Sequence, residues 1–197
     1  TNIAMIWNQV MVKSTQSIWM GAQQKLDEYP DKKLIAESWY RLNPENGFNF
    51  TKLYVERFPK GELDAILVLG AVAGLASQSA LEQFGRTEVD VITADINDQV
   101  VKFIKEGKLS SSIGAHWMGG GFALLHLYDH LHGFPIKKTQ PLFNLIQVDK
   151  SNIDAYAQRF LSGCVLKPDE IRNLSRVYNP NADLSGFVET FSTTWDK

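Results

Sequence analysis

Runs of apolar residues alternate with segments of helical periodicity along most of this chain. The run at 65–69 is uninterrupted, as expected of a parallel strand whose two faces are covered by helices. Between such runs apolar residues recur every three or four positions, as Ile18, Ala22 and Leu26 do within 14–29. Five strand–helix repeats result. They predict the α/β class, with an open parallel sheet and helices on both faces.

Local signals set the expected ends of these elements. Strands are predicted at 3–7, 34–40, 65–69, 89–94 and 111–115, and helices at 14–29, 50–58, 71–84, 100–106 and 122–131. Ser14 or Thr15 is the expected N-cap of the first helix. Asn46 and Gly47 predict a turn before the second helix, and Gly85 predicts the end of the third.

The pattern changes after Pro135, where a lobe spanning 1–136 is expected to end. The remainder, 137–197, is expected to hold a crossing segment and a tail, with a strand at 142–148, a helix capped by Ser151 and a short helix within 168–177. Three large apolar residues, Phe187, Phe191 and Trp195, stand near the end of the chain. They are too many for a free tail and must pack on something.

Composition narrows the classes of function. The chain has 197 residues, with 20 Lys and Arg against 22 Asp and Glu and a net charge of −2, which gives no electrostatic reason to expect nucleic acid as a partner. No apolar run approaches the roughly 20 residues that a membrane span needs. Cys164 is the single cysteine, so no internal disulfide is possible, and no motif around it indicates a nucleophile.

Ligands of open parallel sheets bind beyond the carboxyl ends of the strands. The residues that follow the predicted strands are Asn8, Gln9, Trp39, Tyr40, Arg41, Gly70, Ala71, Asp95, His116 and Trp117. Aromatic faces beside hydrogen-bonding groups suit a neutral, hydroxyl-bearing ligand, and no nucleophile–base pair points to an enzyme. For single residues a structural role is about as credible. Trp39 and Trp117 then belong to the core or to a lid, and Asp95 caps the next helix.

Two other motifs allow a different reading. His126 and His130 lie one helical turn apart with Asp129 beside them, a spacing found in metal sites and metal-dependent enzymes. No third ligand with a sensible spacing follows, so a solvated helix end is favoured and no metal or cofactor is expected. The triplet 119–121 is all glycine but lacks the Lys and Ser or Thr of a phosphate loop. It predicts a helix start packed closely against the sheet.

Several segments resemble one family. The run 64–68, Ala80–Leu81, Phe84–Gly85, the run from Val89 to Asp95, and Ile104-Lys105-Glu106-Gly107-Lys108-Leu109 look like the second half of the type I periplasmic binding proteins. These are the sugar-binding receptors of ABC importers, and effector cores of the lac-repressor class share their fold. The resemblance runs from about residue 3 to 136.

The resemblance implies a carboxy-terminal lobe that closes, with an amino-terminal lobe, over a small sugar-like solute. The crossing near 135–139 resembles the hinge of that family, and the chain is expected to be a fragment whose first lobe is absent. Such receptors are periplasmic, take no cofactor and report to a membrane permease. Longer tails occur in receptors for autoinducer-like ligands that report to a sensor kinase, which is the alternative reading.

The same resemblance implies site residues. Asp95 matches the aspartate that accepts sugar hydroxyls, and Gln16 falls near a ligand-contacting position on the first helix. Trp39, Tyr40, Arg41 and Asn43 cover the loop from which an aromatic side chain approaches, and His116 and Trp117 follow the fifth strand. Gly70 and Ala71 replace the usual Asn-Asp pair. That departure favours a more compact or less hydroxylated ligand, or a signalling molecule.

Overall fold

Four parallel strands form the centre of the first half of the chain. In the computed structural model, which describes all residues except 10, 40–42, 137–143, 163–164 and 196–197, the chain divides into two compact units. These are Thr1–Ser112, the first unit, and Ile113–Lys197, the second unit. In the first unit the strand order is β2-β1-β3-β4, and β5 begins beside β4. The strands are β1 (Asn2–Trp7), β2 (Lys33–Trp39), β3 (Ala65–Val68), β4 (Asp90–Ala94) and β5 (Ser111–Gly114).

The register of these strands brings their carboxyl ends to one edge. Ile6 pairs with Ser38 of β2 and with Val68 of β3, which in turn pairs with Thr93 of β4. The chain order reverses between β1 and β3, the switch point where doubly wound sheets bind ligands. The predicted α/β class and parallel sheet are therefore confirmed.

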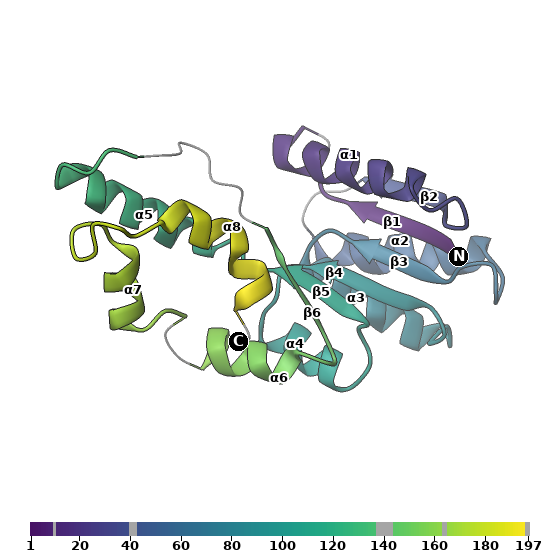
Figure 1. The fold of residues 1–197 in the computed structure, drawn as a ribbon. Coiled ribbons are helices and arrows are strands. Elements are labelled where there is room, and N and C mark those ends of the chain that lie inside the picture. The colour runs from purple at the N-terminus through teal and green to yellow at the C-terminus, as the bar shows by residue number, and fades with distance from the viewer. Residues whose placement is uncertain (10, 40–42, 137–143, 163–164, 196–197) are drawn as a thin grey trace. The chain divides into compact units, whose positions relative to one another are not determined.

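Helices cover both faces of this sheet. They are α1 (Lys13–Asp27), α2 (Pro44–Arg57), α3 (Ala71–Gln83) and α4 (Asp98–Lys105). Trp39 contacts Trp19 of α1, whereas the side chain of the neighbouring Ser38 lies near the Tyr54 hydroxyl of α2, so α1 and α2 lie on opposite faces. Figure 1 shows α2 and α3 side by side, and these helices share the largest helix–helix contact of the first unit.

Two local predictions in the first unit are wrong. The N-cap of α1 is Val12, whose apolar side chain cannot accept a hydrogen bond from the helix. Thr15 is instead buried within the helix. Asn46 and Gly47 form no turn but lie inside α2, because Asn43 and Pro44 already start that helix. A Cβ at Gly47 would meet the backbone of Ala73, so the glycine allows α2 and α3 to approach closely.

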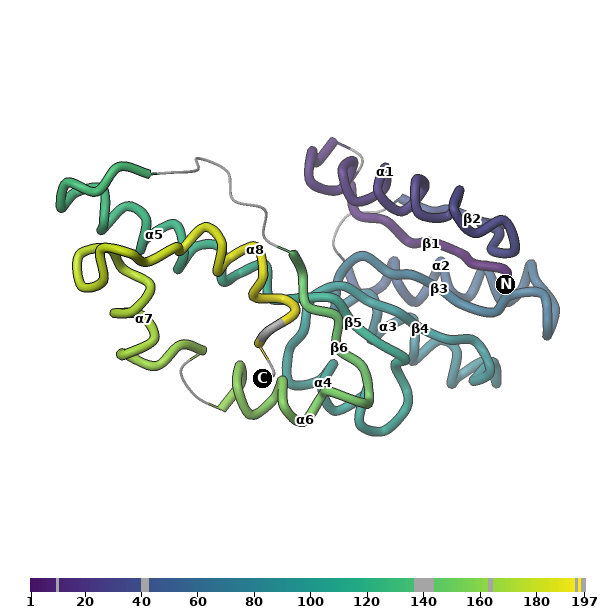
Figure 2. The backbone as a smooth tube through the Cα atoms, in the orientation of Figure 1, coloured from purple at the N-terminus to yellow at the C-terminus, as the bar shows by residue number. Residues whose placement is uncertain are grey.

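The second unit consists mainly of helices. It contains α5 (Met118–Leu131), β6 (Ile146–Asp149), α6 (Ile153–Tyr156), the π-helix η1 (Ala157–Leu161), α7 (Pro168–Leu174) and α8 (Leu184–Thr194). Figures 1 and 2 both show α8 alongside α5. Ser151 does not cap α6: Asn152 is the N-cap, and Ser151 donates to Asp149 Oδ1 at 2.5 Å.

The last residues pack on the core of the second unit, as their apolar character predicted. The ring of Phe191 lies 6.1 Å from those of Phe122 and Phe160, and the ring of Trp195 lies 5.4 Å from that of Phe160. Arg159 donates to the carbonyl of Trp195 at 2.7 Å. These contacts hold α8 against α5 and η1. Cys164 lies outside the described residues, and so does most of the predicted hinge at 135–139.

Within the described ranges, no helix combines the length and the apolar character needed to cross a membrane.

Candidate functional site

The carboxyl ends of three successive strands turn through left-handed backbone. Gly70 after β3 has φ 127°, Asp95 after β4 has φ 70°, and Ala115 after β5 has φ 75°. Asp95 and Ala115 are the two residues other than glycine with positive φ in the described part of the chain. Strained backbone of this kind clusters at functional sites, so the ends of β3 and β4 are candidate site positions in the first unit.

Asp95 is exposed and lies directly beyond β4. Its carbonyl oxygen accepts a hydrogen bond of 2.8 Å from the Ser112 hydroxyl, which fixes the turn. The alternative reading, that Asp95 caps the following helix, is wrong. The N-cap of α4 is Asn97, whose Oδ1 accepts from the backbone N–H of Val100 at 2.9 Å. Position 95 is thus held by its backbone while its neighbour caps the helix.

Trp39 belongs to an aromatic cluster at the end of β2. It stacks on Trp7 with ring centroids 5.8 Å apart and lies 6.3 Å from Trp19 of α1. The indole N–H groups of Trp7 and Trp19 both donate to Glu37 Oε1, at 3.3 and 2.9 Å, and Gln23 donates to the same oxygen at 3.3 Å. One carboxylate oxygen therefore ties α1 to β1 and β2.

Sequence reasoning did not identify Glu37. The sequence feature that could have identified it is the alternation of side chains along β2, because this alternation places Glu37 on the same face as Trp39. A carboxylate among three tryptophans offers hydrogen bonding next to apolar rings. Because Trp7 is almost fully buried, this cluster also supports the core below the strand ends.

The remaining predicted residues of the first unit have separate positions. Asn43 is the N-cap of α2 and accepts from the Glu45 backbone N–H at 2.8 Å, so its side-chain oxygen already has a structural role. Gln16 is exposed in the first turns of α1. Tyr40 and Arg41 lie outside the described residues.

His116 and Trp117 belong to the second unit, where they precede α5. His116 is exposed. Trp117 is 48% exposed, and its ring makes an edge contact with Phe160 at 6.3 Å. It also lines an apolar groove of about 850 Å³ between α5 and α7.

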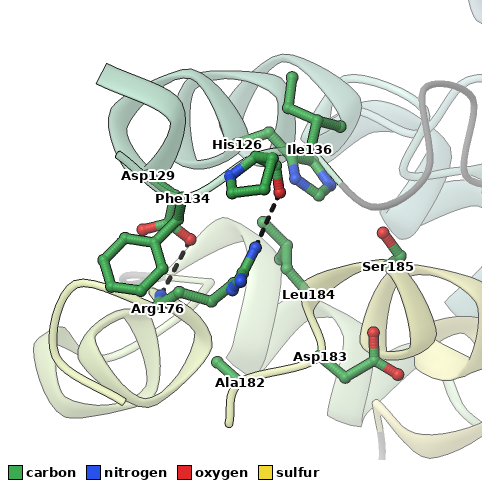
Figure 3. A pocket seen from close by; sticks show the side chains of 10 residues that line it. His126, Asp129, Phe134, Ile136, Arg176, Ala182, Asp183, Leu184 and Ser185 are labelled. Atoms are coloured by element: carbon green, nitrogen blue, oxygen red, sulfur yellow. Dashed lines mark hydrogen bonds between the residues drawn. The ribbon is translucent and has the colours of Figure 1, made fainter. Parts of the chain in front are cut away.

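The acidic residue of the histidine motif takes part in a structural contact. Asp129 is buried and turned toward the tail, where its carboxylate accepts from the Ser175 hydroxyl at 2.5 Å and the Arg176 backbone N–H at 2.9 Å. Figure 3 shows the hydrogen bond between Arg176 and Asp129, with His126 nearby. Among the residues with described positions, no group of three or more His, Cys, Asp or Glu could hold a metal ion.

The cavity in Figure 3 is small. It is lined by His126, Asp129 and Arg176 and has a volume of about 20 Å³, which is room for one water molecule. Two buried nitrogens there, His126 Nε2 and Arg176 Nε, have no hydrogen-bond partner among the described residues. The cavity has the size of a hydration site rather than of a substrate pocket.

Searches against known proteins give a consistent result. No family model matches the chain. It is similar to a xylitol-binding protein of Mycolicibacterium smegmatis, with 26% identity over 155 residues, 74% of this chain and 43% of that protein.

Solved structures show the same likeness. A periplasmic sugar-binding protein from Pseudomonas fluorescens matches with a TM-score of 0.77 and 17% identity, over 91% of this chain and 56% of that one. A periplasmic solute-binding protein of an ABC transporter from Actinobacillus succinogenes, with bound D-allose, matches with a TM-score of 0.71 and 21% identity, over 79% and 54%. The chain thus spans about half the length of the proteins it matches, and their fold confirms the predicted resemblance.

Proposed function

We propose that this chain supplies one lobe of a periplasmic receptor that binds a small sugar or polyol and delivers it to an ABC importer. The observation that carries the proposal is the fold shared with sugar-binding receptors, together with Asp95 at the strained end of β4. The matched proteins are binding proteins, and the first unit offers hydrogen-bonding groups and aromatic rings rather than a nucleophile with its base.

The ligand binds between this lobe and a second one, which is supplied by the part of the receptor that this chain does not span. Ligand contacts to both lobes exist only in the closed state, so binding shifts the equilibrium toward closure. A membrane permease then recognises the closed receptor. A sensor kinase as the recipient of the signal is the alternative, and no contact among the described residues favours it.

Gly70 narrows the class of ligand. Gly70 has no side chain that could bind a hydroxyl group of the ligand. Its φ of 127° also disfavours any residue with a side chain at this position. Fewer hydrogen-bonding groups at this strand end suit a short polyol better than a hexose. We therefore infer that a xylitol-sized polyol binds more tightly than D-allose.

The test uses the full-length gene product and isothermal titration with xylitol and with D-allose. Asp95→Asn removes the charge but tolerates the left-handed backbone, so it isolates the role of the carboxylate. We expect at least a tenfold loss of affinity, since a hydrogen bond to a charged group contributes about 1.5–3 kcal/mol.

The matched control is Asp98→Asn, three residues further on in the first turn of α4. It removes the same charge from an exposed position and should leave affinity unchanged. Equal affinity of the Asp95→Asn variant and the wild type would remove Asp95 from the site. If neither xylitol nor D-allose binds the wild-type protein, the proposed class of ligand is wrong.

A further inference from the structure

One arginine of the tail, Arg176, joins the end of α5 to the segment that follows it. The Arg176 backbone N–H donates to the Asp129 carboxylate at 2.9 Å, and its guanidinium donates to the carbonyl oxygen of Pro135 at 2.7 Å. Figure 3 marks both hydrogen bonds with dashed lines. The same guanidinium lies over the ring of Phe134, 5.0 Å from its centre. Arg176 therefore acts as a clamp on the segment 134–136.

The clamp lacks hydrogen-bond partners at one point. Arg176 Nε and His126 Nε2 are both buried atoms, and neither has a hydrogen-bond partner among the described residues. The Nε of arginine always carries a proton in proteins, so it needs an acceptor. Leaving a buried donor without an acceptor is costly, and native structures rarely do so. The two nitrogens therefore need a partner that the described side chains do not supply.

The cavity beside these nitrogens fits a single small molecule. Its volume of about 20 Å³ is enough for one water molecule, which needs roughly 10–15 Å³, and too small for a sugar. Apolar walls come from residues such as Ile136 and Leu184, while His126 and Arg176 supply the polar lining next to the two nitrogens. A water molecule can accept from Arg176 Nε–H and donate to a neutral His126 at Nε2.

The charges around the cavity favour water over an anion. Arg176 contributes one positive charge, but Asp129 and Asp183 line the same cavity with two carboxylates. A chloride ion would be repelled by both carboxylates at short range. Water carries no net charge and can act as donor and acceptor at once, so it matches both nitrogens.

We propose that this cavity binds one water molecule, which bridges Arg176 Nε and His126 Nε2 and completes the clamp on the segment 134–136. The bridge connects the tail to α5 through two side chains that make no direct hydrogen bond to each other. It satisfies the guanidinium while another N–H of the same group holds Pro135. The inference goes beyond the proposed function and holds whichever ligand the receptor binds.

A high-resolution crystal structure of the full-length gene product tests the site directly. We expect one ordered water within about 3.2 Å of both nitrogens. A cavity without density, or a protein atom bonded to both nitrogens, would overturn the proposal. Crystals grown in bromide distinguish water from an anion, because a bound bromide gives an anomalous peak. Such a peak in the cavity would overturn the proposal in favour of an anion site.

His126→Phe keeps a ring of similar size but removes Nε2, so the water loses one of its two partners. Hydrogen exchange at the Arg176 amide, which is bonded to Asp129, reports on the clamp. Exchange should become about fivefold faster, as expected for one lost water-mediated hydrogen bond. His130→Phe is the matched control, since it makes the same change at an exposed position one turn further along α5. Equal exchange rates in the two variants would contradict the bridge.

A double variant separates a shared water from two independent contacts. Arg176→Lys keeps the positive charge and a donor for the Pro135 carbonyl but removes the Nε donor. If one water links both side chains, adding His126→Phe to Arg176→Lys should speed exchange by less than about twofold, because the bridge is already lost. A fivefold effect of His126→Phe in both backgrounds would show that the two side chains act independently, and the proposal would fail.

Discussion

Helix α4 of the first unit and helix α5 of the second unit differ in how completely their apolar residues are covered. In α4, Val100, Val101 and Ile104 face the sheet, while Lys102 and Lys105 lie on the solvent side. No such division exists in α5, where leucines occupy the exposed side. The apolar residues of α4 are thus buried within its own unit, whereas part of the apolar surface of α5 stays exposed.

The glycines show the same contrast. Gly47 and Gly74 stand where a Cβ would meet the backbone of Ala73 or the side chain of Thr93, so close packing within the first unit requires them. Gly119, Gly120 and Gly121 have open space around them. Close packing thus explains the helical glycines of the first unit, and no contact among the described residues explains those of α5.

The largest effect is expected at Gly47. Gly47→Ala adds a methyl group against the backbone of Ala73, which cannot rotate away, and should destabilise the first unit by about 3 kcal/mol or more. Gly21→Ala, in α1 with no atom within 4 Å, is the control and should be neutral or stabilising by up to about 1 kcal/mol. Urea unfolding measures both. Equal stability of the two variants would mean that α2 and α3 pack less closely than described.

A smaller effect, confined to the second unit, is expected at Asp129. Asp129→Ala leaves the Ser175 hydroxyl and the Arg176 N–H buried without their acceptor and should cost about 2–3 kcal/mol. Asp169→Ala removes an exposed carboxylate from α7 and should cost less than about 0.5 kcal/mol. Hydrogen exchange should show faster exchange in α5 and the tail only. Faster exchange throughout 1–112 would show that the units do not unfold separately.

The smallest effect concerns Tyr54 and depends on pH. Its hydroxyl donates to the Met5 carbonyl at 3.0 Å, and burial raises the pKa of Tyr54 from 10.0 to about 12. Because the folded state holds this proton more tightly, the stabilisation is complete below about pH 10 and is lost as the pH rises through 12.

Tyr54→Phe should therefore cost about 1 kcal/mol at pH 7, from the lost hydrogen bond. It should also reduce the loss of stability between pH 10 and 12, by up to about 2–3 kcal/mol. Urea unfolding of both proteins at pH 7, 10 and 12 measures this. If the wild-type protein loses no more stability than the variant between pH 10 and 12, the raised pKa of Tyr54 is contradicted.

The first unit could be predicted well because its signals are local. Apolar runs predicted all four of its complete strands, and Gly85, with positive φ, follows the end of α3 as predicted. The errors came where tertiary contact outweighed a local preference. Gly47 suggested a turn but serves the approach of α3, and Thr15 suggested a cap but is buried inside α1.

Side-chain roles were harder to predict than elements. Asn43 caps α2 and Asn97 caps α4, as asparagine commonly does. The sequence alone does not show that Asn97, rather than Asp95, caps α4, because this depends on the backbone geometry. Glu37 was missed because its three hydrogen-bond donors lie in other elements. Trp7 is in β1, and Trp19 and Gln23 are in α1, so no local sequence pattern connects them with Glu37. Phe187 and Phe191 were expected to pack, but α8 itself was not predicted, since its partners lie elsewhere in the second unit.

The separation of helix capping from the proposed ligand contact at the end of β4 has a consequence for how specificity can evolve. Asn97 secures α4 through Val100, and the carbonyl oxygen of Asp95 anchors the turn. Asn or Gly at position 95 would keep the turn, because both tolerate left-handed backbone. If Asp95 contacts the ligand as proposed, its side chain can therefore change while Asn97 continues to cap α4.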